Sequence, residues 1–142
     1  MRALTVRQPW ASAITHGTKR TENRSWPVPA KHIGTRILVH AAAAEDRTPR
    51  VSKDVPRQLT DGIGVWPDTR SAIIAVATLT GCHFDKGMSC CAPWGMEGFF
   101  HWELTDVAAL PEPVPTKGAL GFWTLPEDVV NAVCIQQTGV AW

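Results

Sequence analysis

The fold is first indicated by residues 3–17, which read ALTVRQPWASAITHG. The opening residues 3–6 mix apolar and β-branched side chains, as is typical of a short strand. Pro9 suits the first position of a helix, because that position needs no backbone N–H. The apolar residues that follow recur at helical spacing, and Gly17 can end the helix. The stretch therefore predicts a short strand joined directly to a two-turn helix over 9–16.

Further strands are predicted downstream from apolar and β-branched runs. They cover residues 35–40, 71–80, 99–104 and 119–125, and a C-terminal helix is predicted to open at Pro126. The run at 71–80 is apolar enough to be buried on both faces, whereas 99–104 alternates as a half-buried strand does. About five strands and two short helices favour a small, partly closed barrel over a βαβ sandwich.

Two proline-containing segments are predicted to lie outside these elements. Pro111, Pro113 and Pro115 predict an extended, unpaired approach to Gly118. Residues 45–62, which contain two prolines, are predicted to form a short helix or a mobile connection.

The composition is that of one ordinary globular domain spanning 1–142. Hydrophobic residues make up 44% of the chain and charged residues 19%, and a chain of this length can bury roughly two-thirds of its unfolded surface. The longest apolar stretch, 72–77, is far shorter than the roughly 20 residues needed to cross a bilayer. Because the N-terminus also lacks the apolar run of a secretion signal, we expect a cytoplasmic protein without membrane contact.

Four cysteines and five histidines were considered as metal ligands. Cys82-His83 followed by Cys90-Cys91 offers zinc-binding atoms, but neighbouring cysteines on an extended chain point to different sides. Neither a CxxC nor an HxxxH spacing occurs, and the histidines are scattered. We therefore expect four reduced thiols, no metal and no cofactor.

The net charge of +1 conceals a division along the chain. Residues 1–57 hold 11 of the 14 Lys and Arg residues and 4 of the 13 Asp and Glu residues, a balance of +7, whereas residues 58–142 carry −6. This asymmetry is compatible with a basic surface facing an anionic partner such as nucleic acid, or with two halves that neutralise each other in one fold. The near-neutral total implies that any nucleic-acid contact is local.

Two segments concentrate the residue types that recognise nucleotides. The first supplies Arg7, Gln8 and Trp10 around a helix N-terminus, and the second supplies Lys19, Glu22, Asn23, Arg24 and Trp26 within eight residues. Together they offer aromatic planes for a base, donors for phosphate and polar groups for a base edge. The alternative is structural: Trp10 as a core residue, Trp26 as a loop anchor and the charged run as a solvated edge strand.

At these residues the sequence resembles a known family. The blocks QPWA at 8–11 and ENRSW at 22–26, with Leu38-Val39-His40-Ala41 and the block GALGFW at 118–123, strongly resemble the activating signal cointegrator homology (ASCH) domains. Those domains are relatives of the pseudouridine synthase and archaeosine transglycosylase (PUA) fold. The resemblance implies an α+β protein with a PUA-like β-barrel of five to six strands flanked by short helices. It also implies a role in binding RNA and places Gln8, Trp10, Lys19, Glu22 and Arg24 at a cleft.

The resemblance also raises a catalytic alternative. Some small bacterial relatives are acetylcytidine amidohydrolases that use a lysine after the first helix and a threonine three positions later. Lys19 matches that lysine, but Glu22 stands where the threonine would be, and Thr21 on a strand would face the other way. Nuclease activity has been proposed for other relatives, and Lys19 with Glu22 are the tentative catalytic pair for proton transfer.

The sequence thus predicts a domain that binds single-stranded RNA, other single-stranded nucleic acid or a modified nucleoside in a basic and aromatic cleft. The alternatives are a hydrolase acting on a modified nucleoside or on single-stranded RNA, and an adaptor that docks another protein through its aromatic surface.

Overall fold

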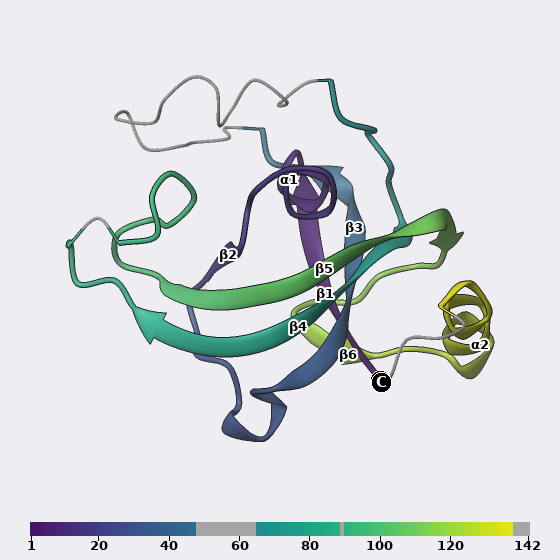
Figure 1. The fold of residues 1–142 in the computed structure, drawn as a ribbon. Coiled ribbons are helices and arrows are strands. Elements are labelled where there is room, and N and C mark those ends of the chain that lie inside the picture. Colours follow the sequence, from purple (N-terminus) through teal and green to yellow (C-terminus); the bar gives the residue numbers. More distant parts are fainter. Residues whose placement is uncertain (48–64, 89, 138–142) are drawn as a thin grey trace.

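The computed structural model describes residues 1–47, 65–88 and 90–137 (Figure 1). In these ranges six strands form one sheet in the order β2-β5-β4-β3-β1-β6. The strands are β1 (Arg2–Gln8), β2 (Thr21–Arg24), β3 (Thr35–Glu45), β4 (Ala72–Phe84), β5 (Phe100–Pro115) and β6 (Phe122–Thr124). The helices are α1 (Trp10–Thr15), a 3-10 turn at Ala30–His32 and α2 (Glu127–Gln136). The predicted α+β class is confirmed.

One parallel pair organises the sheet. β1 runs parallel to β3, with Leu4 opposite Val39, and every other pair of neighbouring strands is antiparallel. Two parallel strands need a crossover connection, so residues 9–34 travel away from β1 and return. On the way they form α1 and then β2, which pairs with β5 at the far edge of the sheet.

The sheet curls so that this far edge comes back to β1. The Arg24 guanidinium on β2 donates through Nη2 to the Thr5 carbonyl oxygen at 2.6 Å, although three strands separate β2 from β1 in the sheet order. Figure 1 shows the long, curved β4 and β5 crossing in front of β1. The result is the partly closed barrel that the sequence predicts.

Apolar side chains cover both faces of the central strands. Leu4 and Val39 belong to an inner core that includes Ile14 of α1. Leu38, the neighbour of Val39, belongs instead to an outer core that includes Val133 of α2. Successive residues of a strand point to opposite faces, so one continuous apolar strand serves both cores. Figure 1 shows α2 lying outside the barrel accordingly.

Several elements differ in extent from their predictions. β3, β4 and β5 all run beyond the predicted strands, and β6 is limited to three residues. The prediction that the Pro111–Pro115 segment is unpaired is wrong, because Val114 and Pro115 pair with Ile73 and Ala72 of β4. Pro111 and Pro113 fall where the register of β4 and β5 shifts, and a shift of register leaves residues without ladder partners. The segment predicted at 45–62 lies outside the described residues beyond 47.

None of the helices in the described part of the chain is long and apolar enough to cross a membrane.

A buried histidine fixes the approach of the last strand. His40 on β3 is 1% exposed, and its Nε2 lies 2.9 Å from the Thr116 carbonyl oxygen. Burial lowers the pKa of His40, and the hydrogen bond to Thr116 opposes that shift. Gly118 packs on the same ring: a Cβ at this position would lie 2.4 Å from Cε1 of His40. Only a residue without a side chain fits here.

We therefore expect Gly118→Ala to lower the free energy of unfolding by about 1–3 kcal/mol, the usual cost of overpacking a filled site. Urea unfolding followed by circular dichroism measures this change. The control is Ile135→Ala on α2, where the side chain is 74% exposed and the change should stay within about 0.5 kcal/mol. Equal effects of the two substitutions would contradict the close packing of Gly118 on His40.

Candidate functional site

A cleft of about 690 Å³ opens beside β2 and the start of α1. Its polar lining comes largely from β1 and the crossover. Its apolar lining comes from Trp10, from two alanines of β3, from the loop of residues 85–99 and from residues 119–121. The lining residues are Thr5, Arg7, Trp10, Lys19, Glu22, Asn23, Arg24, Ala42, Ala44, Asp46, Trp94, Met96, Phe99, Ala119, Leu120 and Gly121. The described cleft therefore joins the basic half of the chain to apolar residues of the acidic half.

A carboxylate held between two cations forms the floor of the cleft. Glu22 Oε2 lies 3.0 Å from Lys19 Nζ, and Glu22 Oε1 lies 3.2 Å from Arg24 Nη2. Lys19 is 2% exposed, and its ammonium also donates to the Thr21 carbonyl oxygen. Each charge of this triad of Lys19, Glu22 and Arg24 therefore has an opposite charge in contact.

Lys19 and Glu22 reach each other because the chain bends between them. Lys19 precedes β2, which begins at Thr21, and its backbone N–H donates to the Ala13 carbonyl oxygen of α1 at 3.2 Å. Glu22 lies on β2 opposite Trp102 of β5. The chain therefore bends between positions 19 and 22, which simple strand alternation would not have paired.

Two indoles form one side of the cleft. Trp10 and Trp94 meet edge to face with ring centroids 6.2 Å apart, and the Lys19 ammonium lies 6.0 Å from the Trp10 ring centroid. Trp10 Nε1 donates to Asp46 Oδ2 at 2.9 Å. The Trp10 ring is thus fixed by a hydrogen bond at its polar end and by aromatic contact at its apolar end.

Two exposed residues stand at the rim of the cleft. Arg7 is exposed, and no hydrogen bond or ion pair joins its guanidinium to another residue of the described ranges. Leu120 is 99% exposed, which is unusual for a large apolar side chain at the edge of a cavity. The rim therefore offers one cation and one apolar contact to a ligand that extends beyond the floor.

An apolar wall of the cleft is formed by Trp94, Met96 and Phe99 of the loop of residues 85–99. A single asparagine of β2 holds this wall. Asn23 Nδ2 donates to the Trp94 carbonyl oxygen at 2.9 Å, and Asn23 Oδ1 accepts from the Met96 backbone N–H at 2.8 Å. Both polar ends of this side chain are therefore used to hold the loop of residues 85–99. We assign Asn23 a positioning role at the cleft.

Six of the eight residues predicted from sequence line the cleft. They are Arg7, Trp10, Lys19, Glu22, Asn23 and Arg24. Gln8 and Trp26 do not line it, for different reasons. Gln8 is 3% exposed and its amide bonds the Ser12 N–H and the Thr69 carbonyl oxygen. Trp26 packs edge to face on Trp102 at a centroid distance of 4.5 Å, and its carbonyl oxygen accepts from Trp102 Nε1.

The apolar wall of the cleft was not predicted from the sequence. Trp94, Met96 and Phe99 reach the cleft from an irregular loop about 70 residues downstream of β2, and no local periodicity marks such residues. Asp46 was missed because it directly follows β3 in a segment predicted as a connection. The only sign of Trp94 and Met96 in the sequence is that an aromatic residue and a methionine lie close together between two strands.

A second polar cluster lies behind this wall. His83, Cys90, Cys91 and His101 place their ligating atoms within 4.8 Å of one another, and in the described ranges they are the one group of this kind. Burial, together with the neighbouring Cys91 and Asp85, raises the pKa of the Cys90 thiol to about 11. A thiol with a raised pKa is a poor nucleophile, because the thiolate is the reactive form. Cys82 and Cys134 are free thiols outside the cluster.

Known proteins resemble this chain in sequence family and in fold. The sequence model of the ASCH domain family matches residues 4–114, whereas a search of curated protein sequences finds no significant match. The crystal structure of ASCH from Zymomonas mobilis is similar at a TM-score of 0.56 and 16% identity, over 94% of this chain and 93% of that chain. A mutant ZmASCH protein from the same organism is similar at a TM-score of 0.58 and 14% identity, over 94% of both chains.

The structural likeness establishes the fold, and the match to the family model covers well over half of the sequence. The chain therefore belongs to the ASCH domain family, whose PUA-like domains are implicated in RNA binding.

Proposed function

We propose that this chain binds single-stranded RNA through the cleft, with one nucleoside, plain or modified, seated in it. The observation that carries the proposal is the size and lining of the cleft. Its volume of about 690 Å³ lies within the roughly 300–1,000 Å³ of small-molecule sites, so it suits a single nucleoside. Cations and aromatic rings meet there as nucleotide recognition requires.

The apolar side of the cleft suits a base. Trp10, Trp94 and Phe99 supply aromatic surface, and the exposed Leu120 adds contact area at the rim. Stacking on an aromatic ring contributes roughly 1–3 kcal/mol per base. The Glu22 carboxylate, already oriented by two cations, retains lone pairs that can accept hydrogen bonds from a base edge.

The charged side suits a single phosphate neighbour and not a long polyanion. Arg7 is exposed at the rim, whereas Lys19 and Arg24 are committed to Glu22. The lining holds three cations and two carboxylates, so its excess of positive charge is small. A base can enter such a cleft only when it is unstacked, which favours single strands over a duplex.

A hydrolytic role for Lys19 and Glu22 is a second hypothesis, favoured by their 3.0 Å contact at the cleft floor. We expect no hydrolysis of acetylcytidine, because Glu22 stands in place of the threonine of the amidohydrolases that this chain resembles. Incubating the purified protein with acetylcytidine and with single-stranded RNA, followed by mass spectrometry, tests both reactions. Turnover of acetylcytidine abolished by Lys19→Ala would contradict this expectation.

Binding to a labelled single-stranded RNA of mixed sequence should be stronger than to the same sequence as a duplex. Because Lys19 and Arg24 are paired with Glu22, we expect Arg7 to make the main phosphate contact, so log affinity against log salt should fall with a slope of about −0.7. Arg7→Ala should weaken binding about tenfold, the value of one lost charge-assisted hydrogen bond. Fluorescence anisotropy over a salt series measures all three quantities.

The control is Lys31→Ala, which removes the same charge from an exposed position of the 3-10 turn outside the cleft. It should change affinity by no more than about twofold, as expected of a distant exposed charge. Preference for the duplex, or equal effects of Arg7→Ala and Lys31→Ala, would contradict the assignment of the cleft as the RNA site.

The floor of the cleft can be tested without a ligand. Glu22→Gln leaves Lys19 and Arg24 facing each other without a counter-charge, so it should lower the free energy of unfolding by about 3 kcal/mol. Lys19→Met should cost less, because Glu22 keeps Arg24 as its partner. The double variant should be more stable than Glu22→Gln alone, while RNA affinity should stay reduced. Thermal and urea unfolding of the four proteins measure this cycle.

The matched control is Asp68→Asn, which breaks the exposed ion pair between Asp68 and Arg70. An exposed pair contributes roughly 0–1 kcal/mol, so this change should be small. If the Lys19 and Glu22 substitutions were additive and as mild as Asp68→Asn, the triad would not be the structural floor of the cleft.

A further inference from the structure

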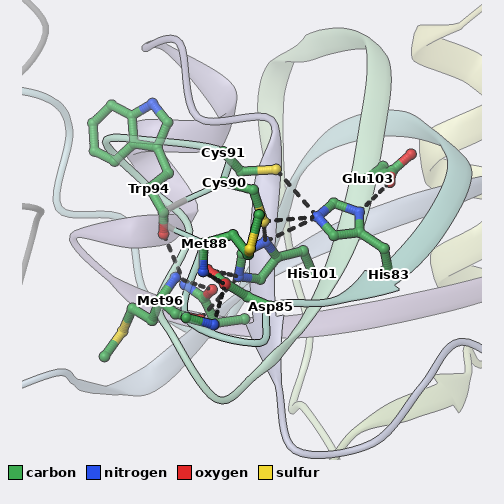
Figure 2. A network of polar contacts seen from close by, with 11 residues as sticks. His83, Asp85, Met88, Cys90, Cys91, Trp94, Met96, His101 and Glu103 are labelled. Atoms are coloured by element: carbon green, nitrogen blue, oxygen red, sulfur yellow. Dashed lines mark hydrogen bonds and ion pairs between the residues drawn. The ribbon is translucent and has the colours of Figure 1, made fainter.

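We propose that His83, Cys90, Cys91 and His101 bind one Zn²⁺ ion, which fastens the loop of residues 85–99 to the ends of β4 and β5. His83 lies near the end of β4 directly opposite His101 at the start of β5. The two cysteines come from the loop that joins these strands. Figure 2 shows both sulfur atoms and both imidazoles converging on one point.

Four of the six distances between the ligating atoms match the edges of a tetrahedral zinc site. With Zn–N bonds of about 2.0–2.1 Å and Zn–S bonds of about 2.3 Å, tetrahedral edges are about 3.3 Å for N–N and about 3.6 Å for N–S. His83 Nε2 lies 3.2 Å from His101 Nδ1, 3.3 Å from Cys90 Sγ and 3.4 Å from Cys91 Sγ. Cys90 Sγ lies 3.5 Å from His101 Nδ1. The two remaining pairs lie within 4.8 Å of each other, so a single ion can reach all four atoms once the widest pair closes toward a tetrahedral edge.

In each imidazole, the ring nitrogen that faces away from the cluster contacts an oxygen atom, as in protein zinc sites. His83 Nδ1 lies 2.5 Å from Glu103 Oε1, and His101 Nε2 lies 2.9 Å from the Met96 carbonyl oxygen. A carboxylate or carbonyl behind the ring is the usual support of a metal-bound histidine, because it fixes the tautomer and the ring orientation. Asp85, which is 1% exposed, adds a carboxylate oxygen 3.8 Å from His101 Nε2.

These supporting contacts leave two lone pairs facing each other. The oxygen atoms behind the rings only accept hydrogen bonds, so His83 Nδ1 and His101 Nε2 carry the ring protons. In the neutral rings, His83 Nε2 and His101 Nδ1 then both present lone pairs across 3.2 Å. A cation between them satisfies both at once, and two thiolates balance its charge.

The backbone of the loop shows why adjacent cysteines can share a site. Neighbouring cysteines point to different sides only where the chain is extended, and residues 90–91 are not extended, because Cys91 has a φ of +59° and opens a turn. The N–H groups of Trp94 and Gly95 donate to the Cys91 carbonyl oxygen at 3.0 and 2.8 Å. A Cβ at Gly95 would lie 2.6 Å from His101 Cε1, so the turn is wrapped closely around the imidazole.

The ligand set indicates zinc in a structural role. Two cysteines and two histidines in tetrahedral array are a ligand combination of structural zinc sites, in which no position is left open for substrate. His101 is fully buried, and the other three ligands are half-buried. The loop that the ion would secure also carries Trp94 and Met96 to the cleft, so the zinc ion would hold the apolar wall in place.

The test is the metal content of the protein and its response to Co²⁺. Protein purified from zinc-supplemented culture should retain about one Zn²⁺ per chain after dialysis, measured by inductively coupled plasma mass spectrometry. Co²⁺ added to the metal-free protein should give the intense visible absorption of a tetrahedral site and a thiolate charge-transfer band. Chelation of the zinc should lower Tm by about 10 °C, as expected for loss of a tightly bound ligand.

Substitutions then assign the ligands. Cys90→Ser, Cys91→Ser and His83→Ala should each reduce retained zinc at least tenfold, whereas Cys82→Ser and Cys134→Ser, outside the cluster, should leave it at about one per chain. His83 is the safest ligand to remove, because its side chain is 36% exposed. If a variant does not fold, the Co²⁺ spectrum of the wild type still decides whether thiolates bind the metal. Wild-type protein without zinc and without that spectrum, or zinc loss in Cys82→Ser alone, would overturn the proposal.

Discussion

The parallel pairing of β1 with β3 is the constraint on which the rest of the structure depends. Neighbouring parallel strands cannot be joined by a tight turn, so the chain after Gln8 has to leave the sheet and re-enter it at Thr35. The intervening residues carry α1 and β2, and β2 pairs at the opposite edge of the sheet. Every charged residue of the cleft floor lies on this excursion. The topology that closes the barrel therefore also assembles the site.

Closure of the barrel and the charge of the site are linked through one side chain. The Arg24 guanidinium bonds both the Thr5 carbonyl oxygen of β1 and the Glu22 carboxylate. It thereby ties the edge strand β2 to β1, near the opposite edge of the sheet, while it holds the acidic group in the cleft. These two contacts explain how a cation can occupy a position that is mostly shielded from water. The backbone N–H of Lys19 donates to α1, and its ammonium contacts the other oxygen of the Glu22 carboxylate.

The sequence predicted those parts of the molecule that are encoded locally. The short strand and helix over 3–16 were confirmed, because apolar spacing and Pro9 act within a few residues. The apolar run at 71–80 was confirmed as part of β4, although the strand continues to Phe84. The extension of β5 to Pro115 was not predicted, because prolines disfavour a strand unless a shift of register accommodates them, and the register depends on the partner strand.

The same contrast between local and long-range signals holds for the candidate site. The residues of β1 and of the crossover were predicted from their types and spacing, and the chain brings six of them to one cleft. Gln8 and Trp26 have the same chemical character but are used within the fold, one by backbone groups and the other by Trp102. The Trp94 wall depends on Asn23 and on a turn at Cys91 that only the folded chain reveals. Long-range hydrogen bonds of this kind leave no periodic signal in a sequence.

The loop of residues 85–99 joins two strands that are antiparallel neighbours, and Asp85 and Phe99 are hydrogen-bonded across its base. Its ends therefore stay together whatever lies between them. A hairpin with this property can be lengthened, shortened or exchanged during evolution without disturbing the strand order. The floor of the cleft and its apolar wall are therefore carried by two separate segments of the chain, joined through Asn23. Descendants of this fold can acquire a new ligand preference by rewriting one hairpin while the crossover stays as it is.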